Sequence, residues 1–407
     1  MIFAVLRYRD FALHWSGQVV SQIGNQLNYV ALAWIVLQTT GSTAAMSGVY
    51  LAQLIPGAVL GWVAGVSVDR ADRRLLMIFC DAARFVIVLA LALGGQGLWA
   101  IYAVTFAVSA LTMVFYTAEK TAIGQLLPEP LWTEAHAFVE ASSQVAALAG
   151  PVLAGILVAS LPTPTHVLYV DTATFAVSGI CIALMHWRDQ PRPSGGGVRA
   201  AMQEVVEGFR HLAASPFLLV VLTTAAVANF LIMPFAVLFP VLSDRVLHAG
   251  SQGFGLLMGG WGGGLLMGSL GASWLSARLS AGTLIFGGMT VLGISFGAMS
   301  AVGNLWGNVA LAALGGFSVA PANAVILTMV QQRTPERMQG RVFATLLAMV
   351  TVAAPLGVAL ASFFLERVGV ATVLLGVGVA TVAAAALGAL ALGRVTQGSR
   401  APDRNPA

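Results

Sequence analysis

The stretch Gly65-Val66-Ser67-Val68-Asp69-Arg70-Ala71-Asp72-Arg73-Arg74 lies between two long apolar runs, residues 44–64 and 75–93. As a helix, each run is long enough to cross the hydrocarbon core of a bilayer, which is about 30 Å thick. The charged residues between the runs must then lie in water at one membrane face. Because short arginine-rich loops stay in the cytoplasm, we interpret the stretch as a cytoplasmic loop between two spans. The glycine at its start allows two helices to approach closely.

The composition indicates that the whole chain is a membrane protein. Of 407 residues, 58% are hydrophobic and 9% are charged, whereas soluble proteins carry about 25% charged residues. These values exclude a soluble globular protein. The formal net charge of +4 comes from arginines spread over many short loops, without a basic stripe interleaved with aromatics, so we expect no nucleic-acid partner. The first apolar run is too long for a cleavable signal peptide, and none is expected.

Twelve apolar runs follow one another along the chain, and each predicts a transmembrane helix. They cover residues 11–37, 44–64, 75–93, 98–116, 135–160, 166–186, 217–242, 253–275, 282–301, 305–329, 342–365 and 370–392. Almost all arginines fall in loops on one side, while Arg245 and Arg367 fall on the other and Arg84 lies inside a span. This bias predicts a multi-pass membrane protein with both termini in the cytoplasm.

The longest break between apolar runs, residues 187–215, divides them into six and six. It contains Pro191, Pro193 and three consecutive glycines, which no helix tolerates well. An amphipathic pattern over residues 199–212 then predicts a short helix on the membrane surface. We therefore expect an N-terminal six-helix bundle (1–187), a cytoplasmic linker with this surface helix (188–215), a C-terminal six-helix bundle (216–394) and a disordered cytoplasmic tail (395–407).

The two halves repeat short features in the same order. Gln125 to Pro128 and the pair Gly150-Pro151 in the first half are echoed by residues 331–335 and 354–355 in the second. Such repeats are typical of transporters built from two related halves. The expected fold class is an all-α membrane protein with twelve transmembrane helices in two pseudo-symmetric six-helix bundles.

The opening stretch reads G-x-x-x-D-R-x-x-R-R and resembles the signature of the loop between spans 2 and 3 in the major facilitator superfamily of transporters. The matching residues are Gly65, Asp69, Arg70, Arg73 and Arg74. The resemblance implies that they form a latch on the cytoplasmic side, which bears on the start of span 11 near Arg341. The alternative is a positively charged loop that only sets the topology.

The resemblance extends over residues 11–392 and narrows to the drug and siderophore exporter branch, which includes macrolide efflux and enterobactin export proteins. It rests on Thr40-Gly41-Ser42, Gly48, Pro56 and Gly61, on the pair Asp81 and Arg84 in span 3, and on Tyr169 to Phe175 in span 6. It implies a bacterial inner-membrane transporter that exports small amphiphilic or hydrophobic compounds. An importer of a nutrient or metabolite is the alternative within the same fold.

No nucleotide-binding P-loop is present, so a proton or another ion gradient is the expected source of energy. Proton coupling usually needs an ionisable group inside the bilayer. The candidate coupling residues are Asp81, Arg84, Glu119, Glu140 and Asp171. Their alternatives are a static Asp81–Arg84 ion pair, solvated glutamates at helix ends, and a hydrogen-bonding role for Asp171. Residues 21–25 resemble the S-Q-x-G-D of the relatives, but Asn25 replaces the acid, so another group must take the proton.

Polar side chains recur on span 1 at helical spacing, and we expect them to line a substrate cavity. The candidate cavity residues are Gln18, Gln22, Asn25, Gln26 and Tyr29, with Asn229, Phe230 and Met233 in span 7. The alternative is that they only form hydrogen bonds between helices. In span 5, Gly150, Pro151 and Gly155 are similar to a glycine–proline motif of antiporters and are candidate hinge residues; an ordinary kinked packing helix explains them equally well.

Two other classes of function share features with this sequence, a membrane-bound enzyme and a transporter-like sensor. The spacing of His166 and Asp171 matches that of some acyltransferases, but no other part of such a site is visible, and we expect no enzyme. A transporter-like sensor is the other possibility. The histidines form no metal-binding pattern, and Cys80 and Cys181 lie inside apolar runs, so neither a metal, a cofactor nor a disulfide is expected. The expected partners of this monomer are a small-molecule substrate, protons or another ion, and the lipid bilayer.

Overall fold

The computed structural model describes residues 2–70, 72–95, 97–187, 189, 209–210, 212 and 215–398; for residues 2–4, 58–70, 121, 336–337 and 395–398 it describes the backbone alone. Every regular element among these described residues is a helix, and they contain no strand. The chain divides into two compact units: Met1–Ala201 with Phe239–Gly259, and Met202–Leu238 with Gly260–Ala407. Each unit is described separately.

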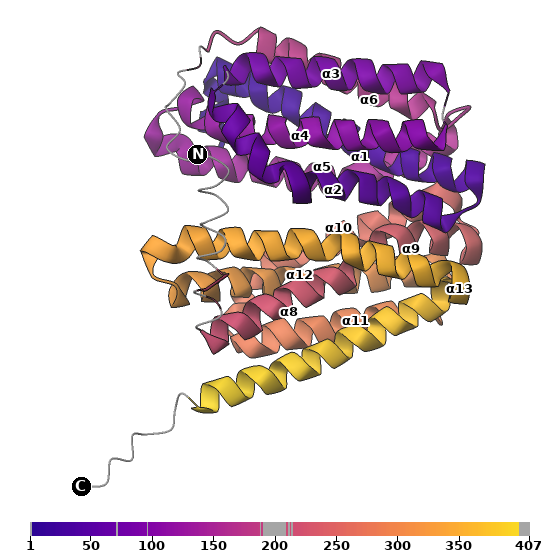
Figure 1. Ribbon diagram of the computed structural model, residues 1–407, viewed down its shortest axis with the longest axis vertical. Coiled ribbons are helices and arrows are strands. Elements are labelled where there is room, and N and C mark those ends of the chain that lie inside the picture. Colours follow the sequence, from indigo (N-terminus) through magenta and orange to yellow (C-terminus); the bar gives the residue numbers. More distant parts are fainter. Residues whose placement is uncertain are drawn as a thin grey trace. The chain divides into compact units, whose positions relative to one another are not determined.

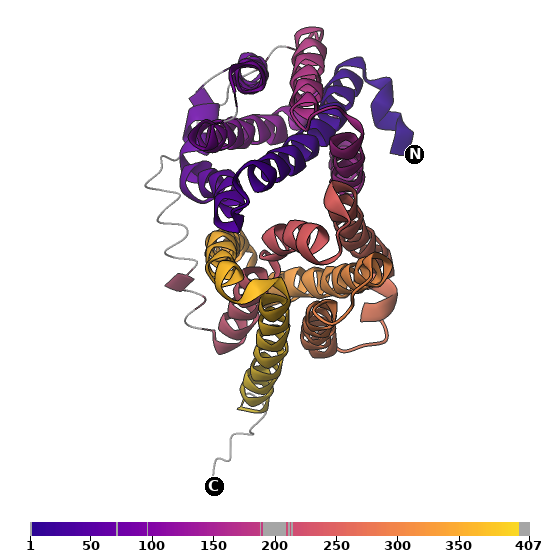
Figure 2. The same ribbon diagram turned by 90° about the vertical axis from the view of Figure 1, so that its right-hand side faces the viewer.

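Six long helices build the first unit (Figure 1). They are α1 (Arg9–Thr40), α2 (Thr43–Arg70), α3 (Arg73–Gly94), α4 (Leu98–Leu126), α5 (Trp132–Ser160) and α6 (His166–Ala183), with the short 3-10 helices η1 (Ile2–Arg7) and η2 (Glu129–Leu131). Helix α1 packs against α5 and α6, α2 packs against α4, and α3 packs against both α4 and α6. Figure 2 shows the same helices after a turn of 90°, most of them seen obliquely.

The charged stretch from Gly65 to Arg74 is mostly helical. Helix α2 continues to Arg70, and α3 begins at Arg73, so the connection between them is shorter than the predicted loop. Asp72 is the N-cap of α3, where its carboxylate accepts a hydrogen bond from the backbone N–H of Leu75 (3.0 Å). At the other end of α2, Gly41 takes a left-handed conformation (φ 62°) that ends α1.

The remaining helices follow in the second half of the chain. They are α8 (Pro216–Ile232), α9 (Phe235–Val241), the π-helical turn η3 (Leu242–Val246), α10 (Gly250–Ser276), the π-helical turn η4 (Thr283–Gly287), α11 (Gly288–Met299), α12 (Leu305–Arg333) and α13 (Glu336–Gly398). Helix α8 packs against α13, and α11 packs against α12 and α13. A Cβ on Gly264 or Gly268 of α10 would overlap a backbone carbonyl of α12, so these glycines permit close packing.

Helix α13 is two helices joined at a sharp break. Gly369 has φ 79° and ψ 164°, a conformation that favours glycine. The orange first part and the yellow second part run in opposite directions (Figure 1). This break agrees with the predicted separation between the last two spans.

Each of the twelve predicted spans corresponds to a helical segment. Seven stretches among the described residues are long and apolar enough to cross a membrane by length and composition: Arg73–Gly94, Leu98–Leu126, Glu129–Ser160, His166–Ala183, Pro216–Val246, Leu305–Arg333 and Met338–Arg394. The last of these contains the Gly369 break and covers two predicted spans. The all-helical class is confirmed for the described residues, and the count of twelve crossings stays a prediction.

Two helices end a few residues away from the expected boundaries. Helix α6 ends at Ala183 instead of His186, because the backbone N–H of His186 turns to the carboxylate of Asp10 (3.1 Å). Helix α13 runs to Gly398, past the predicted end at 394. The predicted surface helix over residues 199–212 lies outside the described residues, apart from 209, 210 and 212, and so does the tail beyond 398.

Candidate functional site

Arg73 of the motif forms a buried ion pair with the segment after α6. Its backbone N–H and its Nη1 donate to the two carboxylate oxygens of Asp189 at 2.8 and 2.9 Å. Both side chains are almost fully buried. Because one hydrogen bond comes from the guanidinium and one from the backbone, the Asp189 carboxylate ties the start of α3 to the beginning of the linker.

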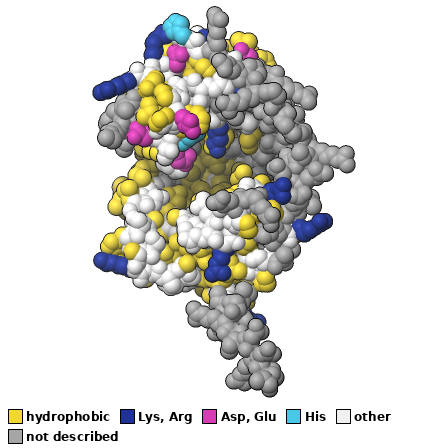
Figure 3. Space-filling model, turned by 90° about the vertical axis from the view of Figure 1, so that its left-hand side faces the viewer, with side chains coloured by type: hydrophobic (Ala, Val, Ile, Leu, Met, Phe, Trp, Pro, Cys, Tyr) yellow, Lys and Arg dark blue, Asp and Glu magenta, His cyan; other side chains and the backbone are white. Residues whose placement is uncertain are grey.

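Arg74 lies on the C-terminal end of α6. Its guanidinium donates to the backbone carbonyls of Ala183 (2.7 Å) and Ile182 (3.2 Å), with a longer contact to that of Trp187 (3.4 Å). A positive charge at this end is favoured by the helix dipole and by carbonyls that have no partner within the helix. Figure 3 shows other basic and acidic side chains exposed on the face formed by this end of the helices.

The rest of the predicted latch lies outside the described side chains. This applies to Gly65, Asp69 and Arg70, for which only the backbone of α2 is described. Their role as a latch, and its contact near Arg341, therefore stay predictions. Arg73 and Arg74, by contrast, contact residues of the first unit.

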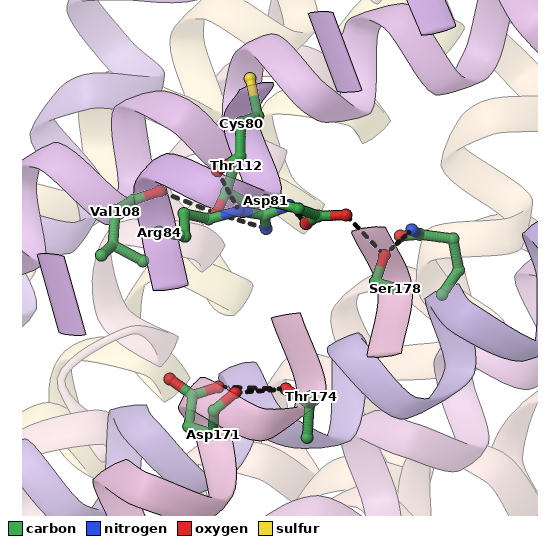
Figure 4. A network of polar contacts seen from close by, with 9 residues as sticks. Cys80, Asp81, Arg84, Val108, Thr112, Asp171, Thr174 and Ser178 are labelled. Atoms are coloured by element: carbon green, nitrogen blue, oxygen red, sulfur yellow. Dashed lines mark hydrogen bonds and ion pairs between the residues drawn. The ribbon is translucent and has the colours of Figure 1, made fainter. Parts of the chain in front are cut away.

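A buried polar network joins α1, α3, α4 and α6 (Figure 4). Arg84 forms an ion pair with Asp81, and each residue is 1% exposed. Ser178 of α6 donates to Asp81 Oδ2 (2.7 Å) and accepts from Gln18 Nε2 of α1 (3.0 Å). Thr112 of α4 accepts from Arg84 Nη1 (3.3 Å). The expected pairing of Asp81 with Arg84 is present in the structure.

Aromatic rings complete the surroundings of Arg84. The guanidinium carbon lies 4.7 Å from the ring centroid of Phe115 on α4 and 4.7 Å from that of Phe175 on α6. A buried guanidinium is costly unless it is paired and hydrogen-bonded, and ring faces add cation–π attraction. These contacts explain how a full charge is held away from water between three helices.

Asp171 is fully buried near the other end of α6. Asn28 of α1 donates from Nδ2 to its carboxylate, and Thr174 Oγ1 donates to the Asp171 carbonyl (2.7 Å). His166 is exposed and hydrogen-bonds Thr163 instead (2.8 Å). Asp171 is thus a hydrogen-bonding centre, and the structure does not bring His166 and Asp171 together as an acyltransferase would require.

The two candidate glutamates differ in their environments. Glu119 is 3% exposed, and its Oε1 lies 3.1 Å from His14 Nε2, so the alternative of a solvated glutamate does not fit this residue. No pattern in the sequence joins the two residues, which are 105 positions apart. Glu140 is exposed on α5 and accepts a hydrogen bond from Gln144 (2.8 Å), which agrees with a solvated glutamate.

The first unit holds a cavity of about 510 Å³. Its described lining contains amides and hydroxyls but no charged side chain: Asn25, Gln26, Asn28, Tyr29, Leu32, Val49, Gln53, Leu54, Gly57, Thr105, Val108, Ser109, Thr112, Met113, Tyr116 and Met258. Asn25, Gln26 and Tyr29 are part of this lining. Gln18 belongs to the buried network, and Gln22 is not among the lining residues, so a substrate cavity along span 1 stays a prediction.

The second unit holds a cavity of about 600 Å³ with a mainly apolar wall. Its lining includes Asn229 of α8 and Met233, which follows that helix, whereas the backbone carbonyl of Phe230 lies against Gly357. A substrate role for these residues stays a prediction. Trp261 lines the cavity and stacks on Phe235 with 4.9 Å between ring centroids. The sequence analysis missed Trp261 and Asn323, although a tryptophan amid glycines and an amide inside an apolar span were available signals.

The predicted hinge residues allow close contacts in the structure. Helix α5 stays helical through Pro151. A Cβ on Gly150 would lie 2.5 Å from Gln26 Cβ, and one on Gly155 would lie 2.5 Å from the Ser251 carbonyl oxygen. Ser251 also donates to the Gly155 carbonyl (3.2 Å). These contacts explain the glycines as packing residues, and a hinge motion stays a prediction.

Comparisons with known proteins agree with these features. A family model described as transmembrane secretion effector matches residues 1–404. Macrolide efflux protein A of Streptococcus pyogenes is 25% identical over 376 residues, which cover 88% of this chain and 89% of that protein. The multidrug efflux pump Tap of Mycolicibacterium fortuitum is 28% identical over 368 residues, which cover 85% and 87%.

Solved structures share the fold at low sequence identity. A bacterial homologue of the human lysosomal transporter Spinster matches with a TM-score of 0.74 at 14% identity, over 97% of this chain and 99% of that one. A bacterial homologue of the iron transporter ferroportin matches with the same TM-score, identity and coverage. At this identity the likeness concerns the fold alone.

Proposed function

Because the chain belongs to the transmembrane secretion effector family of the major facilitator superfamily, we propose that this membrane transporter exports small amphiphilic or hydrophobic compounds. The relatives named for macrolide and multidrug efflux support export over import. The similarity covers most of the length of each relative, so it concerns whole transporters and not a single shared segment.

The chemistry of the two cavities is the observation that carries the proposal. Each is within the range of about 300–1,000 Å³ that suits a small ligand. The cavity of the first unit offers amides and hydroxyls, and that of the second offers aromatic rings, methionine and aliphatic side chains. The first wall suits polar groups of a ligand, the second suits apolar ones, and flexible methionine suits varied shapes.

The energy source that we propose is a proton gradient. Acids inside predicted spans are costly, and where they occur in membrane proteins they commonly serve ion pathways. Asp81 and Asp171 are such acids, and Glu119 lies beyond the predicted fourth span but inside the apolar stretch Leu98–Leu126; all three are buried. Of these, Asp81 is already neutralised by Arg84.

Transport in this proposal follows alternating access between two related halves. Gly65, Asp69, Arg70, Arg73 and Arg74 hold the cytoplasmic side closed in one of the states. The protein works as a monomer in a bacterial inner membrane, with both termini in the cytoplasm.

A susceptibility panel in a pump-deficient bacterial host tests the export function. The panel contains erythromycin, ethidium and a catecholate siderophore, and the variants are D69N and R70A. We expect the wild type to protect against at least one compound, and the variants to reach the membrane in equal amounts without protecting. Absence of protection by the wild type against every compound would reject export of these classes.

A further inference from the structure

His14 and Glu119 form a buried pair between α1 and α4. His14 lies on α1 and is 0% exposed, while Glu119 lies on α4 and is 3% exposed. Their closest atoms, Nε2 and Oε1, are 3.1 Å apart. Neighbouring helix positions Phe11, Phe115 and Ala118 belong to a buried apolar cluster, so water is excluded from this region.

The charged groups around the pair leave Glu119 without another positive partner among the described residues. Helix α3 presents Cys80, Asp81 and Arg84; Asp81 interacts electrostatically with His14 but is paired with Arg84. Helix α6 contributes Ser178 to Asp81 and places Cys181 against Gly17. The described contact between α1 and α5 near the pair joins neutral groups, since Trp15 Nε1 donates to Ser142 Oγ (2.8 Å). Arg7 and Arg9, which precede His14 in the chain, are exposed.

The hydrogen-bonding state of His14 leaves one basic nitrogen open. When Nε2–H donates to the Glu119 carboxylate, Nδ1 carries a lone pair. This Nδ1 is buried and has no hydrogen-bond partner among the described residues. A proton added at Nδ1 produces an imidazolium beside the carboxylate and brings the net charge of the pair from −1 to zero.

We propose that His14 and Glu119 together form a proton-binding site, in which His14 Nδ1 accepts the proton and Glu119 compensates its charge. A buried net charge is unfavourable, so the pair keeps the proton while this region is dry. It releases the proton to water when α1 and α4 admit solvent. The site gives the proton coupling of the proposed exporter a specific location, and in that sense it rests on the proposed function.

Nitrogen-15 NMR of the full-length protein in lipid nanodiscs tests the site directly. The protein carries ring-labelled histidine, and spectra are recorded from about pH 5 to pH 9, the range in which histidine commonly changes charge. The six histidines are separated by comparing the wild type with H14Q. If H14Q folds poorly, the double variant H14Q/E119Q replaces it for assigning the His14 signal. In the double variant, two amides can form a hydrogen bond where the histidine and the glutamate meet. The exposed His136 on α5 provides the matched control H136Q.

The expected result is that the His14 signal converts between the neutral and imidazolium forms in the wild type and in H136Q. In E119Q the imidazolium form of His14 is lost over the same pH range. A His14 ring that stays neutral throughout in the wild type, or one that titrates identically in E119Q, would overturn the proton site.

The titration needs no transported compound, so it separates the two proposals. A protein that titrates at His14 but exports nothing from the panel keeps the proton site and loses the export function. One that exports erythromycin while His14 stays neutral keeps the function and loses this site.

Discussion

The guanidinium of Arg74 lies on the last turn of α6, where its Nη2 donates a hydrogen bond to the carbonyl oxygen of Ala183 at 2.7 Å. A residue in the first turn of α3 therefore satisfies the end of a helix more than a hundred residues later. Together with the Arg73–Asp189 ion pair, this contact fixes the segment from which the linker between the two halves departs. Two arginines of the motif thus have a structural role besides the proposed latch.

Replacing Arg74 with glutamine should destabilise the first unit. The change removes hydrogen bonds from a charged donor to α6 carbonyls, and we expect a loss of about 1–3 kcal/mol in the free energy of unfolding. Thermal unfolding in detergent measures it, with R394A at an exposed position of α13 as the control. Equal melting temperatures for R74Q and R394A would show that the contact to Ala183 is not stabilising.

The buried Asp81–Arg84 pair predicts a strongly non-additive mutant cycle. D81N leaves the guanidinium of Arg84 buried without its counter-charge, which should cost about 3–5 kcal/mol. The double variant D81N/R84M removes both charges and should recover most of that loss, because the two residues act as one unit. Chemical unfolding of the single and double variants provides the comparison. Additive effects would mean that the pair is not coupled as the structure indicates.

Gly24 controls how closely α1 approaches α6. A Cβ at this position would overlap the Thr174 side chain and lie 2.7 Å from Asp171 Oδ1. We expect G24A to destabilise the protein by about 1–3 kcal/mol, as overpacking does. The control is G376A on α13, where an added Cβ meets nothing within 4 Å; alanine should be tolerated or slightly stabilising there. If both variants melt alike, the α1–α6 contact is looser than described.

Asn25 should decide whether the polar cavity accepts cations. The described lining has no acidic side chain, and a cation placed there would lack a counter-charge. N25D supplies one and should bind tetraphenylphosphonium at least about tenfold more tightly than the wild type, a gain of about 1.4 kcal/mol. Equilibrium dialysis of the purified proteins measures it, with N25L as the uncharged control. Equal binding by N25D and N25L would place position 25 outside the ligand path.

The sequence predicted best those structural features that depend on a single helix. Apolar run lengths located the helices, the Gly369 break fell between two predicted spans, and the i, i+3 spacing of Asp81 and Arg84 was enough to expect their ion pair. These features depend on local spacing and on hydrophobicity, which are readable without knowledge of neighbouring helices.

Contacts between helices were not predictable in the same way. His14 meets Glu119 across two helices, and Gln18 turns to Ser178 instead of a cavity. Helical periodicity shows that Gln18, Gln22 and Asn25 share a face, but it does not reveal which neighbour covers each turn of that face. The same limit explains why Trp261 was missed and why the neighbours Asn229 and Phe230 face different surroundings.

Uptake into everted membrane vesicles tests most directly whether this protein is a proton-driven exporter. Vesicles that contain the wild type should accumulate erythromycin or ethidium when an interior-acid proton gradient is imposed. The accumulation should collapse on addition of a protonophore and should be absent with D69N. Accumulation by the wild type that is unchanged by the protonophore, or no difference between wild-type and D69N vesicles, would contradict the account.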